Sequence, residues 1–148
     1  MIIRSLQSIV TLTAALTLSA QAGPAVTALE PGDELRIEYM TTGCFHFSEA
    51  DLVITDGQIR IDGKKTVPLT EEVARHLETY FAVLDDQPLG ACTTTDNLDV
   101  TLIRADGTSE DWAYLDARCI EPVSEGERSE KGLSVSHLVQ MIDRGTGL

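Results

Sequence analysis

The stretch from Leu52 to Ile61 (LVITDGQIRI) decides the fold class of this chain. An Asp-Gly pair between two segments of alternating polarity is the strongest short-range signal for a β-hairpin with a two-residue loop. With Asp56-Gly57 as that loop, Ile54 lies opposite Ile59, and the two ends of the stretch lie opposite each other. The four apolar side chains then share one face of the ribbon, so the turn and the hydrophobic pattern agree on one register.

A second Asp-Gly pair, Asp106-Gly107, predicts a second hairpin in the last third of the chain. If this loop also has two residues, Ala105 lies opposite Thr108. On that register the two faces of the ribbon carry, respectively, Leu98, Val100, Leu102, Ala113 and Leu115, and Thr101, Ile103, Trp112 and Tyr114. Because both faces contain apolar side chains, we expect this ribbon to lie inside a sheet that is partly covered on both sides.

Two segments before the first hairpin are expected to be extended. Leu35, Ile37 and Tyr39 alternate with the residues between them, which indicates a strand. Residues 44–47 are rich in aromatic side chains, which favour β structure. Residues 23–33 contain proline, glycine and small residues and predict an irregular lead-in.

Two helices are predicted in the second half of the chain. Apolar residues recur at helical spacing from Thr70, the expected N-cap, to about residue 85. The last helix has Ser134 or Ser136 as its N-cap and closes at Gly145. This order predicts an α+β fold for residues 34–148, a single domain in which an antiparallel sheet of about five strands packs against two helices as a two-layer sandwich. The patterns do not specify the order of the strands in the sheet.

The first 22 residues predict a secretory signal peptide. Arg4 supplies a positive start, residues 9–18 form an apolar core, and Ala20-Gln21-Ala22 provides the small residues of a cleavage site. The apolar stretch of about 12 residues is shorter than the roughly 20 that a membrane span needs. We therefore expect cleavage before Gly23 and a mature protein in the periplasm or outside the cell.

The charge balance of the chain is strongly acidic, with 24 acidic residues, 11 basic residues and a formal net charge of −13 at pH 7. Such a surface repels the phosphates of nucleic acids and anionic lipid headgroups. We therefore expect neither nucleic acid nor, once the signal is removed, a membrane as a partner, but a basic protein would be attracted. The alternative interpretation is that the charge serves solubility alone.

Three cysteines, Cys44, Cys92 and Cys119, allow at most one bridge within the chain. In an oxidising compartment a disulfide is the default. Extension of the second hairpin with its two-residue loop places Cys92 opposite Glu121 and Cys119 opposite Thr94, a diagonal that a small bend closes to bridging distance. We therefore predict a Cys92–Cys119 disulfide, with a bridge from Cys44 to either of the others as the alternative.

Under that pairing Cys44 is the free thiol, two residues from His46. On a strand the two side chains point the same way, and a neighbouring imidazole favours the nucleophilic thiolate. Cys44 and His46 are therefore candidate catalytic residues of a thiol-dependent enzyme or redox protein. The alternatives are a buried structural cysteine and a Cys44-linked homodimer.

Other kinds of site have less support in the sequence. Cys44, His46 and His76 offer zinc ligands in principle, but no paired zinc-finger spacing occurs, and we expect neither a metal nor a cofactor. No Gly-rich phosphate loop or Gly-x-Ser-x-Gly elbow is present. Trp112 and Tyr114 are candidate residues for binding a peptide or glycan, or else they form core beneath a helix.

Compartment, charge and the lack of a catalytic constellation together favour a non-enzymatic role. We expect a small acidic exported protein that acts as a protein-binding, accessory or inhibitor domain, with a basic protein as its partner. A thiol-dependent activity at Cys44 and His46 is the alternative.

Overall fold

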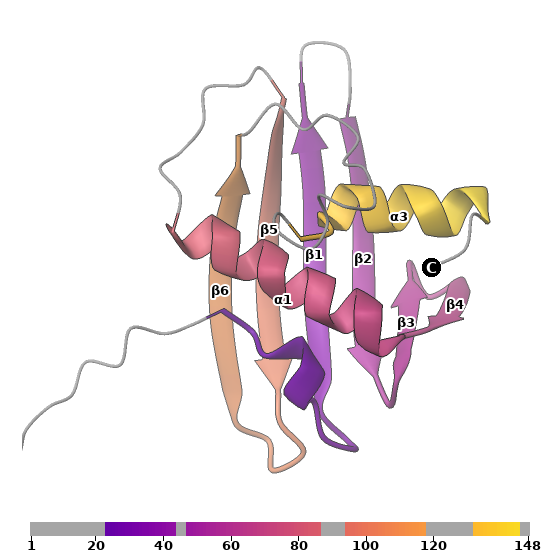
Figure 1. The fold of residues 1–148 in the computed structure, drawn as a ribbon, viewed down its shortest axis with the longest axis vertical. Coiled ribbons are helices and arrows are strands. Elements are labelled where there is room, and N and C mark those ends of the chain that lie inside the picture. Colours follow the sequence, from indigo (N-terminus) through magenta and orange to yellow (C-terminus); the bar gives the residue numbers. More distant parts are fainter. Residues whose placement is uncertain (1–22, 44–46, 87–93, 118–131, 146–148) are drawn as a thin grey trace, which may run out of the picture.

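The computed structural model describes residues 23–43, 47–86, 94–117 and 132–145 (Figure 1). Within these ranges the elements are η1 (Val26–Ala28), β1 (Glu34–Thr42), β2 (Phe47–Thr55), β3 (Gln58–Ile61), β4 (Lys65–Pro68), α1 (Glu71–Asp86), β5 (Thr95–Ile103), β6 (Ser109–Asp116) and α3 (Val135–Arg144). The strands form one antiparallel sheet in the order β4-β3-β2-β1-β5-β6, which does not close. The predicted α+β fold is confirmed, with six strands rather than about five.

The additional strand is β4, which the sequence analysis did not predict. Asp62-Gly63, with positive φ angles of 49° and 64°, turns the chain back along β3. Pro68 ends β4 at the edge of the sheet, where a missing N–H donor is tolerated.

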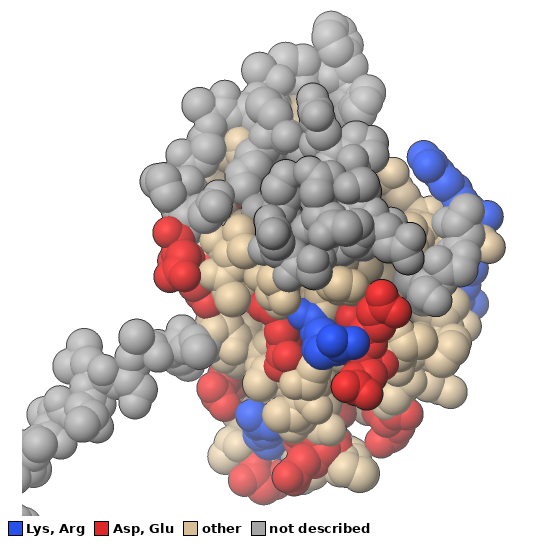
Figure 2. All heavy atoms as spheres, viewed as in Figure 1, with Lys and Arg blue, Asp and Glu red and all other residues tan. Residues whose placement is uncertain are grey.

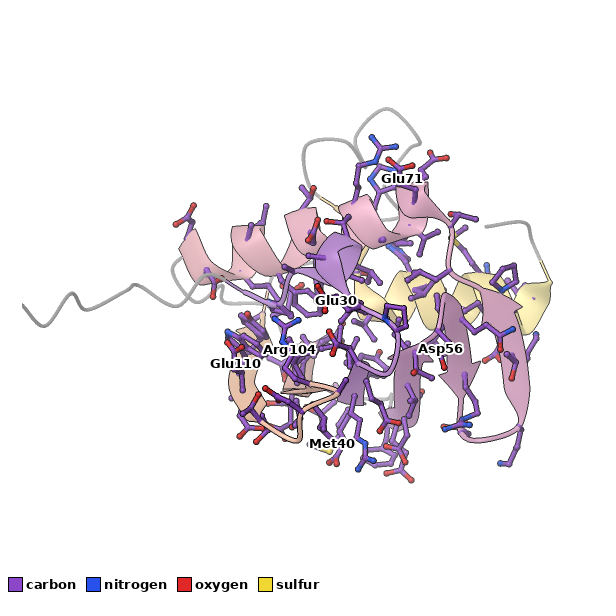
Figure 3. The ribbon with its side chains drawn as sticks, turned by 90° about the horizontal axis from the view of Figure 1, so that it is seen from below. Glu30, Met40, Asp56, Glu71, Arg104 and Glu110 are labelled. Atoms are coloured by element: carbon purple, nitrogen blue, oxygen red, sulfur yellow. The ribbon has the colours of Figure 1, made fainter. Side chains whose placement is uncertain are left out.

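Both α-helices lie on the same face of the sheet, as Figure 3 shows in a view along the layers. The core between them and the sheet includes eight side chains with 0% exposure: Leu35, Ile37, Ile54, Ile59, Leu77, Phe81, Val135 and Leu138. Burial of one such aliphatic side chain contributes about 1.5–3 kcal/mol relative to its exposure. This layer of apolar contacts therefore holds the helices on one side and leaves the other face of the sheet without a covering helix among the described residues.

The first Asp-Gly hairpin has the register that the sequence predicts. Ile54 lies opposite Ile59, and Thr55 opposite Gln58, so that Asp56-Gly57 is a two-residue loop. Both loop residues have positive φ angles, 47° and 71°, as a type I′ turn requires. The four apolar side chains of this ribbon are all buried, and the prediction is confirmed.

The second Asp-Gly hairpin has a different loop, and its predicted register is wrong by one residue. Arg104 rather than Ala105 lies opposite Thr108, because the Arg104 amide donates to the Thr108 carbonyl at 2.8 Å. The Gly107 amide donates to the Arg104 carbonyl at 2.9 Å, and only Gly107 in this loop has a positive φ, 86°. This is a three-residue loop, in which a tight turn is followed by a left-handed glycine.

The one-residue shift reverses the faces of β6. Tyr114 now lies opposite Leu98 and Trp112 opposite Val100, on the side that faces the helices. Ala113 and Leu115 lie on the other side and are exposed. The expectation that this ribbon lies inside the sheet is also wrong, since β6 is the last strand in the sheet order.

The lead-in contributes a buried carboxylate that holds the second hairpin loop. Asp33, 3% exposed, accepts hydrogen bonds from the amides of Glu30 (3.1 Å) and Ala105 (3.0 Å) and from Arg104 Nη1 (2.9 Å). The two backbone hydrogen bonds, together with Arg104, lower the pKa of Asp33. Because Ala105 is the extra residue of the loop, this contact fixes the longer turn.

The predicted helix ends agree closely with the structure. The Val73 amide donates to Thr70 Oγ1 at 3.2 Å at the start of α1. Of the two predicted caps for α3 the structure selects Ser134, whose hydroxyl accepts from the His137 amide at 3.3 Å. Gly145 ends this helix with φ 66°.

Candidate functional site

The face of the sheet that points away from the helices carries exposed apolar side chains. Met40, Phe47 and Leu115 are the large exposed hydrophobic residues of the described ranges, at 40%, 66% and 40% exposure. Met40 lies opposite Asn97, which in turn lies opposite Leu115, so the row crosses β1, β5 and β6. Figure 3 shows Met40 on the side of the sheet opposite the helices.

The next row on this face consists of carboxylates. Glu38 of β1 lies directly opposite Asp51 of β2 and directly opposite Asp99 of β5, and all three are exposed. Like charges placed directly opposite each other destabilise a sheet. Across the part of the chain that the structure describes, none of the three forms an ion pair. The row is therefore a concentration of negative charge that the described part of the fold does not neutralise by ion pairs.

A shallow hollow of about 540 Å³ lies over this row. Its lining residues are Glu38, Tyr39, Met40, Glu49, Ala50, Asp51, Asp62, Lys64, Asn97 and Asp99. We call the surface formed by Glu38, Met40, Glu49, Asp51, Asp99 and Leu115 the acidic–apolar face. It offers carboxylates and apolar side chains in adjacent rows.

The basic residues near the acidic–apolar face do not cancel its charge. Arg36 lies on the same side of β1 but pairs with Glu34 through its Nε atom. Lys64 is the single basic residue in the lining of the hollow. On the helix-covered side Figure 2 shows basic side chains interspersed among acidic ones. Arg60 of β3, opposite Val53, is also exposed on the open face, one row from these carboxylates, so the basic residues there lie beside the negative row and not within it.

A cluster of polar side chains is buried between β5 and β6, at the end of the two strands that is far from the loop joining them. Asp96 and Asp116 lie opposite each other and are 4% and 1% exposed, and Tyr80 donates its hydroxyl hydrogen to Asp116 Oδ2 at 3.0 Å. Burial raises the pKa of Asp96, and the charge of Asp116 raises it further, while a hydrogen bond from Thr41 opposes the shift. Because these groups are enclosed and hydrogen-bonded, we assign them to the core and not to a binding surface.

The residues proposed for thiol chemistry lie outside the described residues. This applies to Cys44, His46, Cys92 and Cys119. The disulfide, the catalytic pair and the Cys44-linked dimer therefore stay predictions. The predicted alignment of Cys92 with Cys119 assumed a two-residue loop, whereas the observed loop has three residues and shifts the register of β6 by one.

The two candidate aromatic residues face the helices. Tyr114 is buried, and its ring stacks on Phe81 with centroids 5.4 Å apart and an interplanar angle of 30°. Trp112 is half-buried, and its Nε1 atom is enclosed without a hydrogen-bond partner among the residues described. Their placement corresponds to the alternative interpretation, core beneath a helix.

Among the described histidines, His76 lies on α1 and His137 on α3. His76 contacts Glu72 within α1, with Nε2 and Oε1 3.6 Å apart. No group of three or more His, Cys, Asp or Glu side chains suited to a metal ion occurs within the described ranges.

The acidic–apolar face was missed by the sequence analysis. The alternation around Leu35, Ile37 and Tyr39 does indicate that Glu38 and Met40 point to the other side of their strand. That Asp51 and Asp99 flank Glu38 depends on the strand order and the registers, which the local patterns did not specify.

No family model matches the chain, and no curated protein is detectably similar to it in sequence. None of the helices in the described ranges is long and apolar enough to cross a membrane.

Proposed function

We propose that this protein is exported and, without catalysing a reaction, binds a basic segment of a partner protein on its acidic–apolar face. One observation carries the proposal: three carboxylates, which form no ion pair with any other described residue, stand in a row beside the exposed side chains of Met40 and Leu115. The signal-like first 22 residues support export of the chain.

The two rows of the face call for a partner with two kinds of side chain. Lysine or arginine residues would relieve the repulsion among Glu38, Asp51 and Asp99, and apolar residues would cover Met40 and Leu115. Met40 and Leu115 are each 40% exposed on either side of Asn97, and a partner's apolar side chains would remove them from water. Charge complementarity of this kind accelerates association and makes it sensitive to salt.

A binding experiment with two short probes tests this proposal. The first probe is a fluorescent peptide of alternating lysine and leucine, and the second replaces leucine with serine at equal charge. We expect the first to bind more tightly, and its affinity to fall as salt is added. Fluorescence anisotropy measures both affinities. Equal affinity of the two peptides would contradict a role for the apolar row.

Matched variants locate the binding. Glu38→Gln with Asp99→Asn removes two charges from the face, and we expect affinity for the lysine–leucine peptide to fall about tenfold at low salt because exposed ion pairs are each worth up to about 1 kcal/mol. The control, Glu71→Gln with Asp143→Asn, removes the same charges from the helix-covered side. Equal losses in both variants would show that only net charge matters and would refute the assignment to this face.

A further inference from the structure

The first described residue of the chain contacts the last turn of α1. The amide nitrogen of Gly23 donates to Asp85 Oδ2 at 3.0 Å. A Cβ atom at this position would lie 2.9 Å from the Tyr114 hydroxyl oxygen and 3.1 Å from Asp85 Oδ2. Gly23 is therefore packed closely between a carboxylate and a phenol.

The Tyr114 hydroxyl has an unmet hydrogen-bonding capacity. Tyr114 is 9% exposed, and its oxygen makes no hydrogen bond of acceptable geometry with the described residues. Burial raises the pKa of this phenol, and Asp85 raises it further through its charge and by attracting the hydroxyl hydrogen. The hydroxyl therefore stays neutral, and its acceptor lone pairs are the part of its hydrogen-bonding capacity that is unmet. A buried acceptor of this kind is costly unless a donor reaches it.

The end of α1 is also short of positive charge. Asp85 lies in the last turn of a helix that ends at Asp86, and no basic residue occurs in that turn. The C-terminus of a helix carries partial negative charge, so two carboxylates there are unfavourable and a cation is favourable. Gly23 thus lies beside a carboxylate, a helix C-terminus and a phenol, and its nitrogen already donates to the carboxylate.

We propose that Asp85 and Tyr114 form a binding site for the α-ammonium group that hydrolysis of the Ala22–Gly23 bond creates. Water adds across the C–N bond, its hydroxyl going to the carbonyl carbon of Ala22 and its hydrogen to the nitrogen of Gly23, which then takes a proton from solvent. The amide has one hydrogen, which Asp85 uses, whereas the ammonium has three. One N–H keeps its hydrogen bond to Asp85, and a second is available to the Tyr114 hydroxyl beside Gly23.

This ion pair secures the lead-in over α1. The Thr27 amide and hydroxyl both donate to Glu78 of the same helix, at 3.1 Å and 2.9 Å, and Val26 is buried in the core. Processing therefore completes a set of contacts that runs along α1 from Glu78 to Asp85. The inference rests on the export assumed in the proposed function, but it does not depend on the basic partner.

Exported protein of defined N-terminus tests the inference. The full precursor is expressed and secreted, its new N-terminus is read by intact mass, and glycine is labelled with ¹³C. The carbon signal of Gly23 is then followed by NMR as a function of pH. We expect the Gly23 α-amino group to titrate above an unhindered amino terminus, and the midpoint to fall by about 0.5 pH in Asp85→Asn.

Asp86→Asn is the matched control, because it removes the same charge from the same helix end without a contact to Gly23. Its midpoint should stay near that of the wild type. Equal midpoints in the wild type and Asp85→Asn would overturn the ion pair. An N-terminus at another residue would overturn the processing step instead, and neither result depends on whether the lysine–leucine peptide binds.

Discussion

Two hairpins in this protein contain the same Asp-Gly dipeptide and use it differently. In the first, Asp56 and Gly57 are the whole loop, and both have positive φ. In the second, Asp106 and Gly107 follow Ala105 in a three-residue loop, and only the glycine is left-handed. The comparison shows that a dipeptide can specify a reversal of the chain without specifying its register.

The difference has a tertiary cause. The Asp33 carboxylate, from the lead-in, accepts hydrogen bonds from the Ala105 amide and from Arg104. The Asp106 carboxylate accepts from the amide and hydroxyl of Thr108, at 2.9 Å and 2.6 Å. These contacts favour the longer loop. Among the described residues, the Asp56 carboxylate accepts only from the Gly32 amide of the lead-in, at 3.3 Å, and makes no hydrogen bond within its own turn.

Truncation of core residues gives the largest expected effect and tests both registers at once. Ile59→Ala should lower the free energy of unfolding by about 2–5 kcal/mol, and Tyr114→Ala by about 3–5 kcal/mol, because both side chains are buried. Leu115→Ala should change it by less than about 0.5 kcal/mol. Urea denaturation measures all three. A large loss for Leu115→Ala with a small one for Tyr114→Ala would restore the two-residue loop.

Removal of the carboxylate that holds the longer loop should have the next largest effect. Asp33→Ala leaves the Ala105 amide and Arg104 without their buried acceptor, so we expect a clear fall in melting temperature and faster hydrogen exchange at the Ala105 amide. Asp111→Ala is the control: it removes from the same hairpin an exposed carboxylate that accepts from Thr101 Oγ1 at 2.7 Å and not from the Ala105 amide. Unchanged exchange at Ala105 would show that the loop does not need Asp33.

Substitutions within the turns sharpen the contrast between the two dipeptides. Gly57→Ala and Gly107→Ala should each cost about 1–2 kcal/mol, since both glycines have positive φ. Asp56→Gly should cost less than Asp106→Gly: glycine adopts the φ of 47° freely and only the 3.3 Å contact from the Gly32 amide is lost, whereas Asp106→Gly removes the acceptor for both the amide and the hydroxyl of Thr108. Thermal unfolding of the four variants decides the matter, and equal responses at Asp56 and Asp106 would remove the distinction.

The smallest expected effect is on the pH dependence of the free energy of unfolding, to which the register of β6 contributes by burying Asp96 and Asp116 together. The observed register places Asp116 opposite Asp96 in the core, facing His137, Tyr39 and Tyr80 as well. Burial raises the native-state pKa of Asp96, so the native protein binds more protons than the unfolded chain between the unfolded and native pKa values.

The free energy of unfolding should therefore fall as pH rises through that interval and be highest on its acid side. In Asp96→Asn this part of the pH dependence should disappear, which urea denaturation at a series of pH values measures. An unchanged profile would mean that Asp96 does not titrate across this range.

Local patterns in the sequence were sufficient for the elements that depend on neighbouring residues. The register around Asp56-Gly57, the cap at Thr70 and the cap pair at Ser134 and Gly145 each follow from a few adjacent side chains. Turn geometry, helical spacing and capping hydrogen bonds act over at most a few residues, so the α+β class was accessible from the sequence.

The tertiary structure alone decided what depends on distant residues. Asp33 reaches a loop 72 residues away and sets the register of β6, which buries Tyr114 and exposes Leu115. The strand order β2-β1-β5 brings Glu38 between Asp51 and Asp99, and so creates the acidic–apolar face. The alternation of side chains along a strand indicates which face of the sheet each residue points to. Which residues lie beside it on that face depends on the pairing with strands that are distant in the sequence.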